Sequence, residues 1–334
     1  MIEEKLIEAR GLTKYFPIKK GIFSRSIDRL RAVHNLSFTV YKSETFALVG
    51  ESGCGKSTTR KLLLRLLEAD QGEVIFKGKN IFQLDSTSMR ELRKNLQVVF
   101  QDPYASLDPK WRIGDIIKEP LLIHRIGNPA ERQARVWELM SMVGLHPEYY
   151  NRYPHEFSGG QRQRIGIARA LALNPEIIIA DEPVSALDVS IQAQVLNMFK
   201  NLQKKLGLTY VFISHDLSVV KHISDRIAVM YLGEIVELAP TCILFQEPKH
   251  PYTRALIASI PVPDPSKKKN LKLVEGEVPS PINPPSGCSF HPRCKEATEN
   301  CKTEPPFLLD LGNGHQVRCH LYKNKVKGVE TSVI

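Results

Sequence analysis

The stretch that decides the fold is Phe46-Ala47-Leu48-Val49-Gly50-Glu51-Ser52-Gly53-Cys54-Gly55-Lys56-Ser57-Thr58. The apolar run 46–49 predicts a buried strand, and leucines at helical spacing predict a helix over 57–67. Residues 50–57 between them match G-x-x-x-x-G-K-S. Glycines let the backbone N–H groups of such a loop point at phosphate oxygens, and the helix adds the positive end of its dipole. The stretch therefore predicts a nucleotide phosphate site.

Two side chains of this loop have specific expected roles. Lys56 should reach the β- and γ-phosphates, and the Ser57 hydroxyl should bind Mg²⁺. A second element, Ile177-Ile178-Ile179-Ala180-Asp181-Glu182, delivers two carboxylates to the end of an apolar strand, where α/β sheets bind ligands. An acidic pair alone is usually a solvated strand end. Beside a phosphate loop, we expect Asp181 to hold Mg²⁺ through water and Glu182 to polarise the attacking water.

The surrounding pattern alternates strands and helices. After short β-rich runs in residues 1–100, residues 102–157 read as a helical insertion in which Asn128-Pro129 begins a helix and Gly144 ends it. Helices over 159–173 and 191–206 then alternate with strands over 177–180 and 210–213. This alternation predicts a parallel sheet with both faces covered.

The chain changes character near residue 260. Residues 261–287 are rich in proline and contain Lys267-Lys268-Lys269, which predicts an extended linker. We therefore expect a nucleotide-binding domain over 1–260 and a small C-terminal module over 261–334. The lysine-rich tail from 323 is expected to be mobile.

Composition bounds the class of protein. Of the 334 residues, 42% are hydrophobic and 25% are charged, which is ordinary for a globular chain. The sequence has no apolar run of about 18 residues that could cross a bilayer, and no secretory signal. A soluble, intracellular protein is therefore expected. The net charge of +10 is spread along the chain without interleaved aromatics, so no nucleic-acid partner is expected.

Six cysteines are distributed unevenly. Four of them crowd into the last fifth as C-x5-C-x6-C-x17-C: Cys288, Cys294, Cys301 and Cys319. In a chain without a signal peptide, such a group more often binds metal than forms disulfides. Four thiolates can hold zinc or an iron–sulfur cluster, and the spacing does not choose between them. Cys54, inside the phosphate loop, is either an oxidation-sensitive switch or, as we favour, a small filler.

The run Phe157-Ser158-Gly159-Gly160-Gln161 separates the families that share a phosphate loop. Ser158 and Gln161 form an S-x-x-Q capping box, and the helix N-terminus that they begin is an anion site. The run resembles the L-S-G-G-Q signature of ABC ATPases, with Phe157 in place of leucine and expected to pack against the helical subdomain. The resemblance implies that 158–161 contact the γ-phosphate of ATP bound by the other protomer, and it contradicts a kinase.

Further motifs of that family follow in order. Gln101 resembles the Q-loop glutamine that senses Mg²⁺ and the attacking water, 185–188 resemble the D-loop, and His215 resembles the switch histidine at the γ-phosphate. Phe16, with Tyr15 as the alternative, lies where the family stacks an aromatic ring on adenine. The resemblance thus implies contacts to ATP from these residues: Phe16, Gly50, Ser52, Gly53, Gly55, Lys56, Ser57, Thr58, Ser158, Gly159, Gly160, Gln161 and Asp188.

The resemblance also implies a fold. It is an α/β, P-loop ABC ATPase with a RecA-like core, an antiparallel β subdomain, a helical subdomain at about 102–173 and a small cysteine-rich C-terminal module. The catalytic residues that it implies are Glu182, His215 and Gln101, and the implied Mg²⁺ ligands are Ser57, Gln101 and Asp181.

The C-terminal part resembles one branch of the family. His250-Pro251-Tyr252-Thr253-Arg254-Ala255-Leu256, the linker and the cysteine segment are similar to the C-terminal region of oligopeptide and dipeptide importer ATPases. Some dipeptide-importer ATPases carry a 4Fe-4S cluster on matching cysteines, which favours iron–sulfur over zinc here. Nickel and sugar importers share this region, so they remain alternatives for the cargo. An ABC ATPase without a transport role is a more distant alternative.

This resemblance implies the partners. The chain is expected to hydrolyse ATP at the interface of a nucleotide-sandwich dimer with a second ABC ATPase, either a copy or a paralogue. The dimer would sit under two membrane permease subunits at the cytoplasmic face of the cell membrane. An extracytoplasmic peptide-binding protein would act with it indirectly.

Overall fold

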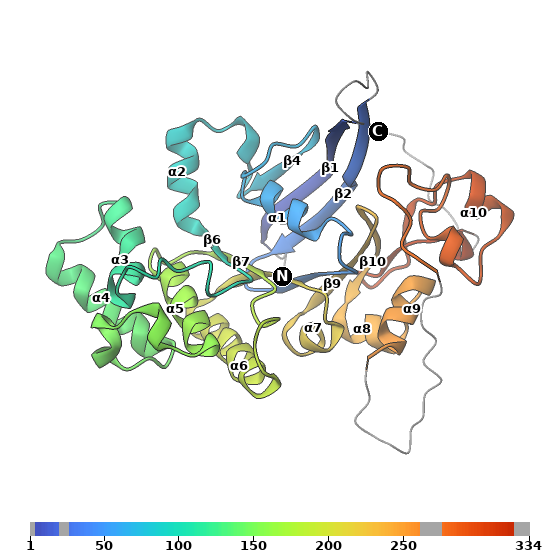
Figure 1. Ribbon diagram of the computed structural model, residues 1–334. Helices are drawn as coiled ribbons and strands as arrows, with labels where there is room; N and C mark the ends of the chain where they lie inside the picture. The colour runs from blue at the N-terminus through green and yellow to red at the C-terminus, as the bar shows by residue number, and fades with distance from the viewer. Residues whose placement is uncertain (1–3, 20–26, 261–275, 324–334) are drawn as a thin grey trace, which may run out of the picture. The chain divides into compact units, whose positions relative to one another are not determined.

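The computed structural model describes residues 4–19, 27–260 and 276–323 (Figure 1). The lysine run 267–269, most of the predicted linker and the tail from 324 lie outside the described residues. The chain forms two compact units. The first unit comprises Met1–Leu6, Val40–Thr45 and Gln83–Ile213, and the second comprises Ile7–Thr39, Phe46–Phe82 and Ser214–Ile334. Within the described ranges, no helix is long and apolar enough to cross a membrane.

The first unit contains the predicted parallel strands. β7 (Ile177–Asp181) lies between β6 (Leu96–Val99) and β8 (Thr209–Ser214), and both pairings are parallel. All five residues of β7 are buried, as expected for a strand covered on both faces. Helices α5 (Gly159–Leu171) and α6 (Val189–Leu206) confirm the predicted alternation to within two residues at each end.

The predicted helical insertion is present in this unit. Helices α3 (Ile113–Ile123), α4 (Pro129–Met142) and α5 pack against one another. They are the green helices of Figure 1. Helix α4 begins as predicted at Asn128, whose side chain accepts the N–H of Glu131 at 3.0 Å while the Glu131 carboxylate accepts the N–H of Asn128 at 2.7 Å. This capping box satisfies N–H groups that the first turn leaves unpaired.

An antiparallel sheet of order β2-β1-β4-β5 belongs mostly to the second unit. Its strands are β1 (Lys5–Lys19), β2 (Ile27–Tyr41), β4 (Gln71–Phe76) and β5 (Lys79–Asn80). The expectation of short β runs here was wrong, because β1 and β2 each have 15 residues. Strand β1 continues through Gly11, where its pairing with β4 shifts register as in a β-bulge.

The second unit also carries a mixed sheet. Strand β3 (Thr45–Val49) is fully buried, as predicted, and pairs in parallel with β9 (Arg226–Tyr231). Strand β9 then pairs antiparallel with β10 (Glu234–Pro240), so the predicted parallel arrangement does not extend to this part of the chain. The antiparallel pairing continues through β12 (Gln316–Arg318) to β11 (Leu308–Asp310).

Helices complete both units. Helix α1 (Lys56–Leu63) is four residues shorter at its C-terminus than predicted, because Arg65 takes a left-handed conformation with φ 48°. Helix α2 (Ser86–Asn95) was not predicted, and Asp85 caps it through the N–H of Ser88 at 2.7 Å. The other helices are α7 (Leu217–Ile223), α8 (Thr241–Gln246), α9 (Pro251–Ala258) and α10 (Glu299–Thr303). Short 3-10 helices span Ile81–Gln83, Pro147–Asn151, Pro154–Glu156, His291–Arg293 and His320–Tyr322.

A buried carboxylate joins β10 to the C-terminal segment, which we define as residues 276–323. Glu237 has no exposed surface, and its Oε1 accepts the N–H of Lys249 at 2.7 Å and lies 2.7 Å from His315 Nε2. Its Oε2 accepts the N–H of His250 at 2.9 Å. One side chain therefore joins β10, the start of α9 and the turn before β12.

We expect Glu237→Ala to lower the free energy of unfolding by about 3 kcal/mol or more, because it leaves two buried donors and one half-buried donor without their acceptor. Chemical denaturation monitored by circular dichroism measures this change. The matched control is Glu299→Ala on α10, whose side chain is 86% exposed. The control should stay within about 0.5 kcal/mol of the parent. Equal stabilities of the two variants would contradict the role given to Glu237.

Candidate nucleotide site

The phosphate loop, residues 50–57, lies between β3 and α1 in the second unit. A Cβ atom on Gly50 would stand 2.3 Å from the carbonyl oxygen of Met230, and one on Gly55 would stand 2.3 Å from that of Ala32. Gly55, at φ 107°, also has a conformation that other residues rarely adopt. The loop can follow this path only with glycine at both positions.

Lys56 crosses its own loop. Its side chain is buried, and its ammonium donates to the carbonyl oxygens of Gly50 at 2.6 Å and Glu51 at 3.0 Å. Among the described residues, no side chain caps the start of α1. The loop therefore combines a cation with the positive end of a helix, which is the arrangement that phosphate binding requires.

The other residues predicted in this loop differ in exposure. Ser52, Gly53 and Ser57 are exposed, and Thr58 is half-buried. Cys54 is 4% exposed, and burial is the largest influence on its thiol, whose pKa it raises despite the opposing charge of Lys56. A buried thiol with a raised pKa is a poor nucleophile, which favours the filler interpretation of Cys54.

Sequence reasoning missed a set of contacts to Glu51. Its N–H donates to the Tyr252 hydroxyl at 3.0 Å, and its carboxylate accepts two bonds from the Arg293 guanidinium at 2.9 and 3.3 Å. Tyr252 lies in the stretch 250–256 that the resemblance had singled out, but no local pattern connected Arg293 to the loop. These contacts are tertiary, and only the fold shows them.

Two predicted catalytic residues meet in the first unit. Gln101 Nε2 donates to Glu182 Oε2 at 2.9 Å. Glu182 takes a left-handed backbone conformation with φ 45° directly after β7, and its N–H donates to the carbonyl oxygen of Ile213 at 2.9 Å. Such a conformation is uncommon for glutamate and is often found at functional sites. Asp181, the last residue of β7, is 5% exposed.

The predicted capping box begins α5. The N–H of Gln161 donates to Ser158 Oγ at 3.4 Å, and the Gln161 side chain accepts the N–H of Ser158 at 3.0 Å. A Cβ on Gly160 would stand 2.4 Å from Ile191 Cγ2, so α5 approaches α6 closely there. Phe157 is 5% exposed and packs edge-on against Tyr149 at 5.6 Å, as expected for the helical subdomain.

The remaining predicted residues are spread over both units. Phe16 is half-buried on β1, with the Lys14 ammonium 6.0 Å from its ring centroid. The alternative, Tyr15, has its hydroxyl 3.2 Å from His34 Nδ1. His215 is exposed after β8 in the second unit, whereas Asp188 is exposed at the start of α6 in the first.

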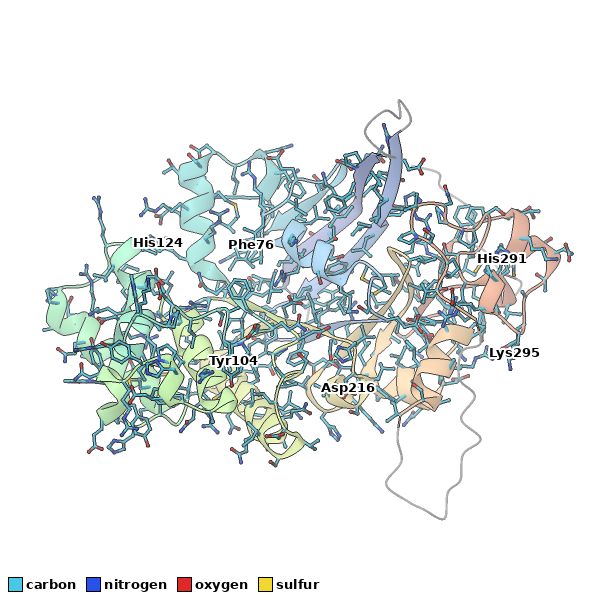
Figure 2. The ribbon with its side chains drawn as sticks, in the orientation of Figure 1. Phe76, Tyr104, His124, Asp216, His291 and Lys295 are labelled. Carbon is cyan, nitrogen blue, oxygen red and sulfur yellow. The ribbon has the colours of Figure 1, made fainter. Side chains whose placement is uncertain are left out.

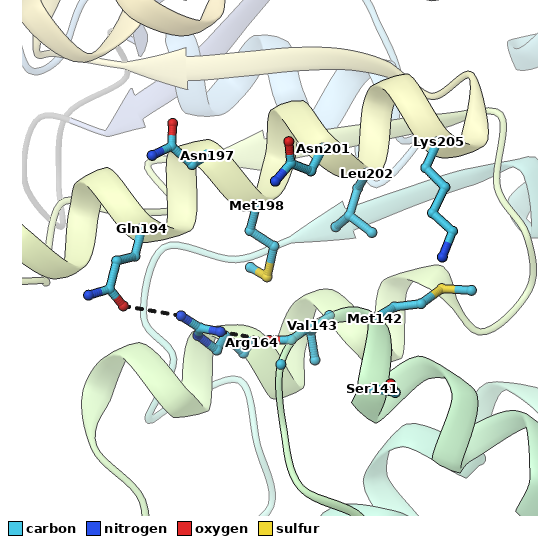
Figure 3. A pocket seen from close by; sticks show the side chains of 11 residues that line it. Ser141, Met142, Val143, Arg164, Gln194, Asn197, Met198, Asn201, Leu202 and Lys205 are labelled. Carbon is cyan, nitrogen blue, oxygen red and sulfur yellow. Dashed lines mark hydrogen bonds between the residues drawn. The ribbon is translucent and has the colours of Figure 1, made fainter.

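A cavity of about 440 Å³ in the first unit is a competing ligand site (Figure 3). None of the predicted nucleotide contacts lines it. Its central cation, Arg164, already donates to the carbonyl oxygen of Val143 at 2.8 Å and to Gln194 Oε1 at 3.2 Å. Because none of the motif residues lines this cavity, the phosphate loop remains the candidate nucleotide site.

The four C-terminal cysteines are free thiols whose charges influence one another. Burial, with the other three thiols as smaller contributions, raises the pKa of Cys319 to about 12. The thiols of Cys288, Cys294 and Cys319 each accept the N–H of the residue two positions on, and Cys301 Sγ lies 3.5 Å from the N–H of Thr298. Even so, the described residues include no group of three or more His, Cys, Asp or Glu side chains placed to hold a metal ion. The predicted metal sites, whether for Mg²⁺ or for a cluster on the cysteines, are thus not confirmed.

Two parts of the chain match known protein families. Residues 33–185 match the ABC transporter family, and residues 236–301 match the C-terminal region of oligopeptide/dipeptide transporters. The chain is 53% identical to the oligopeptide transport ATP-binding protein AppF of Bacillus subtilis, over 96% of this chain and 98% of that protein. It is 50% identical to the dipeptide transport ATP-binding protein DppF of Haemophilus influenzae, over 94% and 96% of the two chains.

A solved structure gives the same result for the fold. A dimeric, post-hydrolysis structure of the ATP-binding cassette MJ0796 bound to ADP and phosphate is 29% identical. It covers 71% of this chain and 99% of its own, with a TM-score of 0.63. The chain therefore belongs to the ATPase subunits of ABC transporters, among relatives that are oligopeptide and dipeptide transport ATP-binding proteins.

Proposed function

We propose that this ATPase energises the import of dipeptides or oligopeptides. The assignment of peptides as the cargo depends on the match of residues 236–301 to the oligopeptide/dipeptide transporter C-terminal region. This region lies beyond the cassette that all ABC ATPases share. The two relatives named above are called oligopeptide and dipeptide transport ATP-binding proteins, and the similarity to each covers almost its whole length. These observations support peptides over the nickel and sugar alternatives.

The chain's own residues suggest how hydrolysis proceeds. The phosphate loop and Lys56 bind the β- and γ-phosphates, with Ser57 and Thr58 at the start of α1. Glu182 accepts the proton of the attacking water, and its contact with Gln101 at 2.9 Å orients the carboxylate. Ser57, Gln101 and Asp181 offer the oxygen ligands that Mg²⁺ prefers, and the ion would neutralise phosphate charge there. His215 contacts the γ-phosphate from the end of β8.

The second half of each site comes from another protomer in this proposal. The start of α5 presents Ser158 and Gly159, with Gly160 buried behind them and no carboxylate in the first turn, so it is suited to the γ-phosphate of a partner's ATP. Asp188, exposed before α6, would join that interface. The dimer would be peripheral at the cytoplasmic face of the membrane, under two permease subunits supplied with peptide by an extracytoplasmic binding protein.

Coupling to the permease is proposed at the segment after Gln101. Tyr104 is 61% exposed, and the Arg162 guanidinium stacks on its ring 3.8 Å from the centroid. Arg162 itself is buried and donates to the carbonyl oxygen of Pro154 at 2.6 Å. Tyr104, labelled in Figure 2, is thereby held by α5 with an aromatic surface left over for a partner.

The test of the function is Glu182→Gln, which keeps the shape of the side chain and removes its basicity. We expect ATP binding to persist while hydrolysis slows at least about a hundredfold, as for loss of a general base. Steady-state phosphate release and calorimetry with ATP measure the two properties. In cells that lack the parent gene, the parent should restore uptake of a labelled tripeptide and the variant should not.

The control is Glu138→Gln on α4, a carboxylate that is 52% exposed and pairs with Arg135. It should hydrolyse ATP and support uptake like the parent. Hydrolysis by Glu182→Gln at the parental rate would contradict the role of Glu182. Loss of nickel or sugar uptake, with tripeptide uptake intact, in the deletion strain would contradict the peptide cargo.

We further propose that Cys288, Cys294, Cys301 and Cys319 hold a 4Fe-4S cluster, with zinc as the alternative. The support is chemical: the four thiols influence one another, and each has an N–H donor beside it. N–H donors to sulfur stabilise metal-bound thiolates and tune iron–sulfur clusters. Such a cluster would stabilise the segment and take no part in hydrolysis.

Anaerobic purification tests this proposal. We expect brown protein with iron and acid-labile sulfide each near about four per chain, as for a 4Fe-4S centre. Cys294→Ser should lose the colour, whereas Cys242→Ser, at an exposed cysteine outside the group, should keep it. Colourless protein with one zinc would establish the alternative. Four alkylatable thiols in fresh protein would contradict both.

A further inference from the structure

Glu51 is the residue through which the C-terminal part of the chain holds the phosphate loop. It has three anchors: its N–H on the Tyr252 hydroxyl, its carboxylate on Arg293 and its carbonyl oxygen on the Lys56 ammonium. Two of the three come from residues beyond 250. All of these residues belong to the second unit.

The Arg293 contact is a paired, largely buried ion pair. Both of its terminal nitrogens bond to separate oxygens of Glu51, and the side-chain exposures are 6% for Arg293 and 28% for Glu51. Burial lowers the pKa of Arg293, but Glu51 and Tyr231 together raise it by more, so the net shift is upward and the guanidinium stays charged. A bidentate pair fixes the orientation of both side chains as well as their separation.

Charge explains why the pair matters to nucleotide binding. The phosphate loop is built for a polyanion, yet position 51 places a carboxylate in it. An unpaired carboxylate there would repel the phosphates at short range, in surroundings where water screens poorly. Arg293 cancels this charge and holds the carboxylate by its two bonds.

The C-terminal segment fixes the arginine in turn. Arg293 ends the 3-10 helix His291–Arg293, whose first residue is labelled in Figure 2. Phe290, immediately before this helix, is buried with its ring 5.2 Å from that of Tyr231 and 5.4 Å from that of Tyr252. The Arg293 guanidinium lies 5.9 Å from the Tyr231 ring. Packing around Phe290 therefore places the cation.

A second contact holds the same stretch against the cassette. Ser289 Oγ donates to the buried Glu234 Oε2 at 2.9 Å and accepts from Arg31 at 3.0 Å. The side chains of Ser289 before Phe290 and of Arg293 after it therefore both attach the stretch 288–294. The position of Arg293 depends on the segment and not only on its own side chain.

We propose that Arg293 is a positioning residue of the ATP site, which neutralises and orients Glu51 so that the phosphate loop accepts ATP. The cassette thereby depends for nucleotide affinity on a residue of the C-terminal segment. The inference rests on residues 50–57 being the ATP-binding loop. Measuring Mg-ATP binding by the parent and by Lys56→Ala would test that premise separately, without any change at Glu51 or Arg293.

A double-mutant cycle over Glu51 and Arg293 tests the proposal, with Mg-ATP affinity measured by calorimetry on the full chain. We expect Arg293→Met to weaken binding about tenfold, because it leaves a carboxylate unpaired in the loop. In the Glu51→Gln background, the same change should alter affinity less than about twofold, because no charge is left to neutralise. Arg293→Lys, which keeps the charge but not the two parallel bonds, should fall between Arg293→Met and the parent.

The control for general damage to the segment is Glu296→Gln. Glu296 lies three residues after Arg293, and its exposed carboxylate pairs with Arg254 rather than with Glu51. Its ATP affinity should equal that of the parent. If Arg293→Met does not fold, the cycle is run with Arg293→Lys in the two backgrounds. Equal weakening by the arginine change in the parental and the Glu51→Gln backgrounds, or parental affinity of Arg293→Met, would overturn the proposal.

Discussion

The close approach of the phosphate loop to its neighbours is the constraint on which the candidate site depends. The carbonyl oxygens of Met230 and Ala32 stand where a side chain on Gly50 or Gly55 would begin. Met230 lies on β9, which pairs in parallel with β3, the strand that leads into the loop. The sheet therefore fixes the distance between the loop backbone and Met230. The loop can therefore turn its N–H groups and the start of α1 toward one ligand, and Lys56 can cross it with two backbone bonds.

The phosphate loop needs a balance of charge as well as a particular backbone path. Lys56 brings a cation to the loop, and Glu51 brings an anion that no phosphate site needs. Arg293 and Tyr252 hold that residue from beyond the cassette core, and the glutamate's own side chain is only 28% exposed. In the first unit a second glutamate, Glu182, has a left-handed backbone and accepts a hydrogen bond from Gln101. In the proposed mechanism the two carboxylates have opposite roles, since Arg293 neutralises Glu51 whereas Glu182 stays available as a base.

Much of the fold followed from local pattern, and the failures have physical causes. Strands β3, β7 and β8 are buried apolar runs, and α4 and α5 begin at capping boxes, so short-range chemistry specifies them. The length of β1 could not be predicted because pairing with β4 carries the strand through Gly11. The early end of α1 depends on the left-handed conformation of Arg65, and the hairpin β11–β12 is fixed in the sheet by β10, which is distant in sequence. For the same reason the motif residues of the site were found from sequence, whereas the Glu51–Arg293 pair, 242 positions apart, was not.

The central claim is that residues 50–57 bind the phosphates of ATP through Lys56. Calorimetry with Mg-ATP on Lys56→Ala tests it most directly, with Lys61→Ala as a control on the exposed face of the same helix. Loss of the charged hydrogen bonds should weaken binding on the order of tenfold to a hundredfold for Lys56→Ala and leave Lys61→Ala unchanged. Parental affinity of Lys56→Ala would contradict the account.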